Sequence, residues 1–454
     1  MTALWTHQQE AVAFAVQRKA TMWHMGMGTG KSRCAIELAK RVKAKRVVIL
    51  CPLSVCSAWS DQLLQFGPDF IDINLSKGSV RAKAKKAKDA ATRAYAMGHP
   101  FVVTVNYESA RNKPLAQWLE EQNFDLLVLD ESHRIKSPGG TTSRWVSRLA
   151  RTCKRRVALT GTPMPHSPLD VYAQFRSLVP ELFGWSFVRF RKLYAVMGGY
   201  QGRQVQGFQR MDEMQRKLAE WTYQADRSVL DLPDAIHDRR LVELTPKAMK
   251  LYEDLDRDFT ASVLDGEITA ANALVKLLRL QQLTSGRVTV ERDTNTEQVE
   301  IDDTKKAALT DLLHDLPQDE PVVVFGRFAS DLKTAHEAAA ATGRGSLELS
   351  GKRRELEDWQ AGRAQVLAVQ IQAGGTGIDL TRARYCVYLS AGYSLGDYEQ
   401  SLARVHRPGQ SRTVFYYHIV ATGTVDEKVY AALQQRKQVV ETVLDGIHSD
   451  PNPF

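Results

Sequence analysis

Residues 25–42 read MGMGTGKSRCAIELAKRV, and this stretch carries the strongest local signal in the chain. Its three glycines let a loop turn its backbone N–H groups inward, and the start of the helix that follows favours an anion. Lys31 can then reach the β- and γ-phosphates of ATP, and the Ser32 hydroxyl can bind Mg²⁺. Met25 occupies the first glycine position of the strict phosphate-loop pattern. A glycine-rich turn without a ligand is the alternative, and the Gly-Lys-Ser ending favours the phosphate loop.

An apolar run that ends in two acids is the second signal. Residues 126–133 read LLVLDESH, which predicts a strand with Asp130 and Glu131 at its carboxyl end. At that edge of a parallel sheet, Asp130 can hold Mg²⁺ through water while Glu131 polarises the attacking water. A strand that runs into an acidic turn is the alternative. The phosphate loop lies about 100 residues upstream, and the two motifs together predict ATP hydrolysis.

Short apolar runs alternate with helix-length segments, which favours an α/β fold with mainly parallel sheets. The runs form two series, so we expect two α/β lobes rather than one large sheet. The segment 165–320 between the series has a mostly helical pattern. The candidate strands are 46–50, 101–105, 125–130 and 155–160 in the first series, and 321–325, 365–369, 385–389 and 414–420 in the second.

The two halves of the chain differ in charge. Residues 1–232 contain 35 Lys and Arg against 19 Asp and Glu, a net charge of +16, whereas residues 233–454 contain 26 against 33, a net charge of −7. The basic half predicts a polyphosphate partner such as nucleic acid. Residues 77–93, KGSVRAKAKKAKDAATR, contain seven basic residues and one acid. We interpret them as an exposed Ala/Lys helix, with a nucleic-acid contact or a targeting signal as alternatives.

The overall composition excludes several classes of protein. Of the 454 residues, 43% are hydrophobic and 25% are charged, and no run of 18 apolar residues occurs. This is typical of a soluble globular protein with two or three domains and predicts no membrane span. The start of the chain shows no secretory pattern, and the five cysteines include no Cys-x-x-Cys pair. We therefore expect a cytoplasmic protein of a bacterium or a virus-infected host, with the nucleus as the alternative location.

Two candidate arginine fingers lie in residues 400–410, QSLARVHRPGQ. Arg404 and Arg407 are three residues apart, so on a helix they would lie on the same side. Paired guanidinium groups can neutralise the charge that develops on a transferring phosphoryl group. A solvated basic helix end is the alternative. Because these arginines belong to the second lobe and the phosphate loop to the first, hydrolysis would depend on closure of the lobes.

Nine blocks of sequence occur in an order typical of one family. They are LWTHQ (4–8), MGTGKS (27–32), VVILCPLSVCSAW (47–59), VVTVNYE (102–108), LLVLDESHRIKS (126–137), ALTGTPMPHSPLDVYAQF (158–175), VVVFGRF (322–328), AVQIQAGGTGIDLTRA (368–383) and YEQSLARVHRPGQ (398–410). In these blocks the chain resembles the Swi/Snf-type ATPases, the double-stranded-DNA translocases of helicase superfamily two, in a compact form without accessory domains.

The resemblance implies roles for individual residues. Those that would bind ATP are Gln8, which would read the adenine, Gly28, Thr29, Gly30, Lys31, Ser32, Gly377 and Asp379, with Mg²⁺ at Ser32 and Asp130. Those that would act in catalysis are Lys31, Asp130, Glu131, Gln400, Arg404 and Arg407. Those that would contact DNA are Ser54, Thr160, Thr162, Gly375 and Thr376.

The resemblance also implies the domain organisation. We expect two RecA-like lobes, each a mainly parallel sheet flanked by helices. Lobe 1 would span residues 1–232, with a helical protrusion at about 165–230. Lobe 2 would span residues 233–454, with a helical insertion at about 245–300 and a C-terminal helix at about 425–446.

The expected function is that of a DNA-dependent ATPase that moves along double-stranded DNA. Phosphate contacts would dominate, with little base specificity, and the motor would be monomeric. A strand-remodelling helicase that reverses forks, anneals or unwinds, with forked DNA as a substrate, is the first alternative. A non-catalytic DNA-binding scaffold is the second. The sequence names no recruiting protein.

Overall fold

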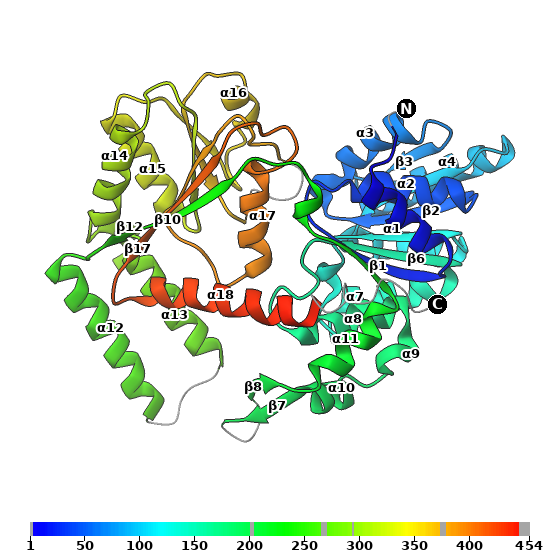
Figure 1. The fold of residues 1–454 in the computed structure, drawn as a ribbon, viewed down its shortest axis with the longest axis horizontal. Coiled ribbons are helices and arrows are strands. Elements are labelled where there is room, and N and C mark those ends of the chain that lie inside the picture. Colours follow the sequence, from blue (N-terminus) through cyan, green and yellow to red (C-terminus); the bar gives the residue numbers. More distant parts are fainter. Residues whose placement is uncertain (1–2, 200–203, 265–269, 293–294, 373–377, 445–454) are drawn as a thin grey trace. The chain divides into compact units, whose positions relative to one another are not determined.

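The computed structural model describes residues 3–199, 204–264, 270–292, 295–372 and 378–444. The chain divides into two compact units (Figure 1). One unit comprises residues 1–231 and 436–454, and the other comprises residues 232–435. Both are built on a parallel sheet with helices on its faces, so the predicted α/β fold with two RecA-like lobes is confirmed. Among the described helices, none is long and apolar enough to cross a membrane.

The sheet of the first unit has seven strands in the order β3-β4-β2-β5-β6-β1-β9, and every pairing is parallel. The strands are β1 (Ala20–Met25), β2 (Arg46–Cys51), β3 (Ile71–Asn74), β4 (Phe101–Asn106), β5 (Leu126–Asp130), β6 (Arg155–Thr160) and β9 (Thr222–Ala225). The connecting helices are α1 (Thr6–Val16), α2 (Lys31–Arg41), α3 (Cys56–Phe66), α4 (Val80–Ala96), α5 (Tyr107–Ala110), α6 (Leu115–Glu121) and α7 (Thr141–Thr152).

Both faces of this sheet are buried, which explains its continuous apolar runs. Val47 and Ile49 of β2 belong to a core cluster with α1, α2 and α3, whereas Val48 and Leu50 belong to a cluster with α4, α6 and α7. Successive side chains of a strand point to opposite faces, so a strand covered on both sides must be apolar at every position.

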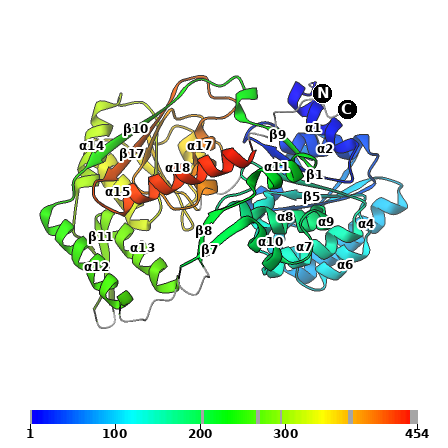
Figure 2. The ribbon, with the colours of Figure 1, turned by 60° about the horizontal axis from the view of Figure 1, so that its bottom comes forward.

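The region after β6 is less purely helical than expected. It contains α8 (Val171–Leu178), α9 (Pro180–Phe183), α10 (Phe187–Tyr194) and α11 (Met211–Ala219), but also an antiparallel hairpin, β7 (Ala195–Gly198) with β8 (Gln204–Phe208). Figure 2 shows the hairpin beside α10. Strand β9 then returns to the main sheet beside β1. The segment predicted as a helical protrusion at about 165–230 thus contains a hairpin as well as helices, and its strands are only four and five residues long.

The second unit has a six-stranded sheet in the order β10-β17-β16-β13-β15-β14, again parallel throughout. The strands are β10 (Ala235–Val242), β13 (Val322–Gly326), β14 (Ser346–Leu349), β15 (Val366–Gln370), β16 (Tyr385–Tyr388) and β17 (Val414–Ala421). The helices are α14 (Thr304–Asp315), α15 (Ala329–Ala341), α16 (Leu356–Gln360), α17 (Leu395–Val405) and the first half of α18 (Val425–Leu444), which passes into the first unit at Arg436.

The predicted helical insertion of the second unit consists of two helices and a hairpin. The helices are α12 (Pro246–Leu264) and α13 (Ala270–Thr284), and the hairpin joins β11 (Arg287–Arg292) to β12 (Asn295–Glu300). The predicted C-terminal helix begins at Val425 as expected and is described as far as Leu444.

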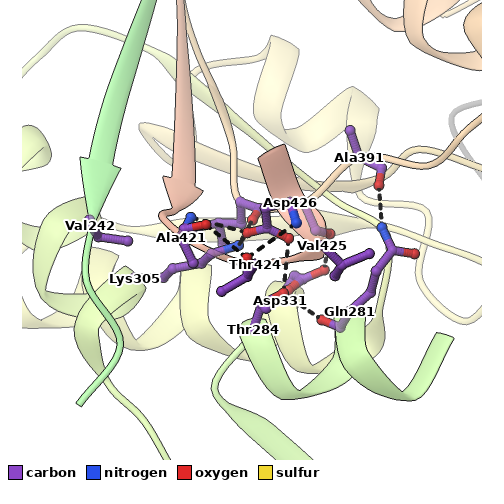
Figure 3. A network of polar contacts seen from close by, with 12 residues as sticks. Val242, Gln281, Thr284, Lys305, Asp331, Ala391, Ala421, Thr424, Val425 and Asp426 are labelled. Atoms are coloured by element: carbon purple, nitrogen blue, oxygen red, sulfur yellow. Dashed lines mark hydrogen bonds and ion pairs between the residues drawn. The ribbon is translucent and has the colours of Figure 1, made fainter. Parts of the chain in front are cut away.

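A buried ion pair joins the secondary-structure elements of the second unit (Figure 3). The Lys305 ammonium of α14 lies 2.5 Å from Asp426 Oδ2 of α18, and the two side chains are only 4% and 5% exposed. Lys305 also donates to the Leu389 carbonyl after β16, and Asp426 accepts from the Thr284 hydroxyl at the end of α13. A buried charge is tolerated only when it is paired and hydrogen-bonded, so each member depends on the other.

Lys305→Met should therefore lower the free energy of unfolding of the second unit by about 3–5 kcal/mol, because it leaves the Asp426 carboxylate buried without its cation. Urea unfolding followed by circular dichroism measures this loss.

Lys333→Met is the matched control, since Lys333 of α15 is 60% exposed and lies 3.9 Å from Glu337. It should cost less than about 1 kcal/mol. Equal losses for the two variants would contradict the structural role of the buried pair.

Candidate functional site

The parallel sheet of the first unit brings the predicted ATP-site segments to one edge. Strands β5, β6 and β1 are neighbours, with Asp130 opposite Leu159 and Thr160 opposite His24. Because the strands are parallel, the loops that follow them leave from the same edge of the sheet. Lys31, the Asp130–Glu131 pair and the Thr160–Thr162 segment lie in these loops or at the strand and helix ends that they join.

The loop between β1 and α2 has the geometry of a phosphate cradle. Gly28 and Gly30 have φ angles of +85° and +86°, a left-handed conformation that favours glycine. A Cβ atom at Gly30 would lie 2.2 Å from Gln8 Nε2, so a side chain there would also clash. Lys31 Nζ donates to the carbonyls of Met25 at 2.8 Å and Gly26 at 3.0 Å. The ammonium group is therefore folded over the loop that it is predicted to serve.

Two side chains of α1, Gln8 and His7, contact the Thr29 carbonyl of this loop. Gln8 Nε2 donates to the Thr29 carbonyl at 3.0 Å, and His7 Nε2 lies 2.9 Å from the same oxygen. Thr29 Oγ1 in turn donates to the Gly26 carbonyl at 2.7 Å. Gln8 is 2% exposed, and its adenine-reading role stays a prediction. His7 was not predicted, because its contact depends on folding of the chain rather than on a local pattern.

The two acids at the end of β5 differ in backbone conformation: Asp130 is the last residue of the strand, and Glu131 is left-handed. Strand β5 ends at Asp130, and Glu131 has a φ of +50°, which is unusual for a residue with a side chain. Successive side chains of a strand point to opposite faces of the sheet, but the left-handed conformation of Glu131 ends this pattern. The two adjacent carboxylates therefore need not point to opposite faces. Such strain is typically found at functional sites.

Asp130 is held in an apolar setting that disfavours its charge. Its Oδ2 accepts a 2.8 Å hydrogen bond from Trp59 Nε1 of α3. Burial, followed by the neighbouring Glu131 charge, raises the pKa of Asp130 to about 7, while the Trp59 bond and the Lys31 charge act in the opposite direction. A nearby cation would stabilise the ionised form of this buried carboxylate and lower its pKa again. Trp59 is a site residue that the sequence pattern did not reveal.

A hydrogen-bond network connects the acidic segment to the Thr160–Thr162 segment. His133 Nδ1 lies 3.4 Å from both Glu131 Oε2 and Thr160 Oγ1. The Thr160 hydroxyl accepts from the Thr162 amide at 3.1 Å. His133, whose role was not predicted, thus links the acidic segment to the Thr160–Thr162 segment.

Gln174 of α8 forms a second link between the same loops. Its Oε1 accepts from the Ser132 hydroxyl at 2.7 Å, and its Nε2 donates to the Pro163 carbonyl at 2.7 Å. Gln174 is fully buried. Gln174 therefore joins the residue after Glu131 to the residue after Thr162, a link that local sequence does not reveal.

The remaining site residue of the first unit is Ser54. It lies exposed in a 3₁₀ turn, Leu53–Val55, that follows β2 and so leaves from the same edge of the sheet. Its predicted DNA contact stays a prediction.

The predicted residues of the second unit surround the end of α17. Gln400 is half-buried on this helix, and Arg404 is 8% exposed in its last turn. Helix α17 ends at Val405, so Arg407 lies beyond it and donates to the Ile378 carbonyl at 3.1 Å. The expectation that both arginines share one helix face is therefore wrong. Pro408 follows Arg407, and the proline ring disfavours a helical backbone conformation of the residue before it.

The segment before α17 carries the other predicted residues of this unit. Asp379 is exposed, and its Oδ1 accepts from the backbone amide of Thr381 at 2.9 Å and from its hydroxyl at 2.7 Å. Buried Gln410, which was not singled out, donates to the Ala383 carbonyl at 2.8 Å and so ties this segment to the end of the final block. Gly375, Thr376 and Gly377 lie outside the described residues.

The first unit fits a nucleotide with a hard divalent cation. Among the described residues, no group of three or more His, Cys, Asp and Glu side chains could hold a metal by itself. The Ser32 hydroxyl and the Asp130 carboxylate are oxygen donors of the kind that Mg²⁺ uses, and Mg²⁺ characteristically takes its other ligands from water and phosphate. The donor set therefore suits Mg²⁺ that arrives with ATP.

Asp130 should give the unliganded protein a characteristic pH dependence. The unfolded chain has an Asp pKa near about 3.9, whereas the folded value is about 7. The folded state holds this proton more tightly, so the stabilising contribution is full below about pH 4 and is lost as the pH rises towards 7.

The variant Asp130→Asn removes this titration. Its free energy of unfolding relative to the wild type should rise between about pH 5 and pH 8 in urea titrations without nucleotide. A difference that stays constant over this range would contradict the raised pKa.

Two models of protein families match most of this chain. The model of the SNF2-related domain family matches residues 7–298, and that of the helicase conserved C-terminal domain matches residues 304–409. The chain is 26% identical over 459 residues to protein p41 of Acyrthosiphon pisum secondary endosymbiont phage 1, with 95% of each chain covered. It is 24% identical to the DNA annealing helicase and endonuclease ZRANB3 of Bos taurus, covering 97% of this chain but only 40% of that protein.

A solved structure, the Sulfolobus solfataricus SWI2/SNF2 ATPase core in complex with dsDNA, is 20% identical, with a TM-score of 0.44 and coverage of 98% of this chain and 93% of that one. The SNF2-related model alone matches well over half of the sequence. The chain therefore belongs to the SNF2-related family of helicase-like ATPases, and it is an ATP-hydrolysing enzyme of that class.

Proposed function

We propose that this protein is a DNA-dependent ATPase that translocates along double-stranded DNA by coupling ATP hydrolysis to closure of its two RecA-like lobes. The observation that carries the proposal is the convergence of Lys31, Asp130 and Glu131 at one sheet edge, with the Thr160–Thr162 segment hydrogen-bonded to the same acidic loop. Such an arrangement ties nucleotide chemistry to a segment that is predicted to touch DNA.

Each residue of the cradle has a distinct task in this proposal. Bound Mg²⁺ would neutralise charge on the β- and γ-phosphates. Lys31 holds the phosphates, Ser32 and Asp130 hold the cation, and Glu131 orients the attacking water. Because Asp130 is buried, the divalent cation favours its ionised form over the protonated form of the unliganded protein.

We further propose that Arg404 and Arg407 complete the reaction from the second unit. Guanidinium groups stabilise the charge that develops as the γ-phosphoryl group leaves. Since Lys31 and Arg404 belong to different units, hydrolysis would require the lobes to close. Closure that accompanies each turnover is the step that would move the protein along DNA.

The charge of the first 232 residues and the names of related proteins both favour DNA as the partner. The first 232 residues carry a net charge of +16, which suits the phosphate backbone more than individual bases. Two relatives that match more than nine-tenths of this chain are named a DNA annealing helicase and a DNA repair protein, the latter rhp54 of Schizosaccharomyces pombe at 25% identity.

Strand remodelling by the same motor is the second candidate. The observation that favours it is the match of 97% of this chain to the DNA annealing helicase ZRANB3. Displacement of a triplex-forming strand reports movement along duplex DNA, whereas annealing and fork-reversal assays report remodelling. Activity on forks without triplex displacement would favour the second candidate over the first.

Duplex DNA should increase kcat for ATP hydrolysis by roughly tenfold or more, equivalent to about 1.4 kcal/mol of the barrier. Phosphate release is measured without nucleic acid and with single-stranded DNA, duplex DNA, forked DNA and RNA. The stimulation should weaken as salt rises from about 50 to 200 mM, because binding releases counterions. A rate that duplex DNA leaves unchanged would overturn the proposal.

Glu131→Gln should reduce hydrolysis by about 10²–10⁴-fold while ATP binding is retained, because the amide keeps the size but loses the charge that polarises water. Filter binding and phosphate release separate the two effects. Glu121→Gln, at an exposed position of α6, is the matched control and should hydrolyse ATP normally. Full DNA-stimulated turnover in the Glu131 variant would exclude Glu131 from the chemistry, and DNA binding without any wild-type turnover would favour the scaffold alternative.

A further inference from the structure

The basic stretch at 77–93 forms a well-defined helix with two unlike faces. Helix α4 spans Val80–Ala96 and is capped by the Ser79 hydroxyl, which accepts from the Ala82 amide. Its buried face consists of small residues that pack in the core of the first unit, namely Ala84, Ala87, Ala91 and Ala94. Its exposed face carries the cations Arg81, Lys85, Lys86, Lys88 and Arg93, with Lys77 exposed just before the helix.

Three of these cations form a continuous stripe. Arg81, Lys85 and Lys88 are spaced four and three residues apart, so they lie along one side of the helix. All three are exposed, and among the described residues no ion pair joins them to a carboxylate. Like charges at this spacing destabilise an isolated helix by about 0.2–0.5 kcal/mol per pair. Exposed Asp89, four residues after Lys85, is the one acid on this side of the helix. The stripe therefore keeps a net positive charge at a small cost in stability.

The helix is fixed to the edge of the sheet that carries the nucleotide loops. It follows β3, so its N-terminal end lies at the carboxyl edge, and Figure 1 shows it beside that outer strand. Lys83, which is 4% exposed, donates to Asn106 Oδ1 at the end of β4 at 3.2 Å and to Ser109 Oγ of α5 at 2.8 Å. Burial lowers the pKa of Lys83. This lysine anchors the helix, while its neighbours face outward.

We propose that the exposed stripe of α4, defined by Arg81, Lys85 and Lys88, is an auxiliary binding surface for the phosphate backbone of duplex DNA. The inference rests on the proposed function and adds a contact outside the nine blocks that resemble the family. The stripe offers flexible cations along one helix face, which suits closely spaced phosphates. An acidic protein would need apolar anchors as well, and the exposed large side chains here, Tyr95 and Met97, lie at the opposite end of the helix.

The triple variant Arg81→Gln/Lys85→Gln/Lys88→Gln tests this surface in the full-length protein. Fluorescence anisotropy with a labelled duplex should show about tenfold weaker binding or more at about 100 mM salt, and a salt slope smaller by up to about 2.7. The DNA concentration for half-maximal ATPase stimulation should rise by the same factor, whereas kcat at saturating DNA and the rate without DNA should not change.

Lys19→Gln/Lys43→Gln/Lys45→Gln is the matched control. These exposed lysines precede β1 and β2 and so lie at the opposite, amino edge of the same sheet. The control removes the same charge and should weaken binding less than about threefold, a measure of the loss of net charge alone. Equal effects of the two triple variants, or none from either, would overturn the α4 surface.

The wild-type assay separates this inference from the function on which it rests. If duplex DNA stimulates wild-type ATPase but the α4 variant behaves like its control, only the auxiliary surface is wrong. If duplex DNA neither binds nor stimulates the wild type, the proposed function itself fails. Urea unfolding should show the α4 variant to be as stable as the wild type or slightly more stable, since the substitutions relieve repulsion.

Discussion

The parallel alignment of β5, β6 and β1 is the constraint on which the candidate site depends. It makes three loops leave one edge of one sheet, although about 130 residues separate the first loop from the last. Strand register thereby brings the phosphate cradle, the acidic pair and the Thr160–Thr162 segment to one edge, where side-chain hydrogen bonds link them further. The two faces pack against different helices, so a slip of one residue would exchange the side chains that fit each set and disrupt the packing on both faces.

The chemistry of this edge is obtained at a cost in stability. Asp130 is buried where its charge is disfavoured, and Glu131 holds a backbone conformation that few residues with side chains adopt. Trp59, His133 and Gln174 stabilise the arrangement by hydrogen bonds that involve the acidic loop or its neighbours. In the second unit, the Lys305–Asp426 pair plays a different part, since it joins helices and strand ends rather than serving a reaction.

The sequence predicted the features that a local pattern encodes. All eight candidate strands are present, because strands covered on both faces are apolar throughout. Five strands of the two main sheets were not among the candidates: β1, β3, β9, β10 and β14. Strand β10 is an edge strand whose residues Ala235–Leu241 are exposed, and β3, β9 and β14 are only four residues long. The glycines and acids of the candidate site were predicted from their spacing, whereas Trp59 and Gln174 contribute through contacts that exist only after folding. The shared helix face of Arg404 and Arg407 failed because α17 ends between them.

A structure of the full-length protein with Mg²⁺ and a non-hydrolysable ATP analogue tests the central claim most directly. The account predicts that the β- and γ-phosphates lie in the loop at Gly28–Lys31, with the cation bound by Ser32 and reached by Asp130, and with Glu131 facing the γ-phosphate. A nucleotide bound elsewhere, or a cation that contacts neither Ser32 nor the water shell of Asp130, would contradict it.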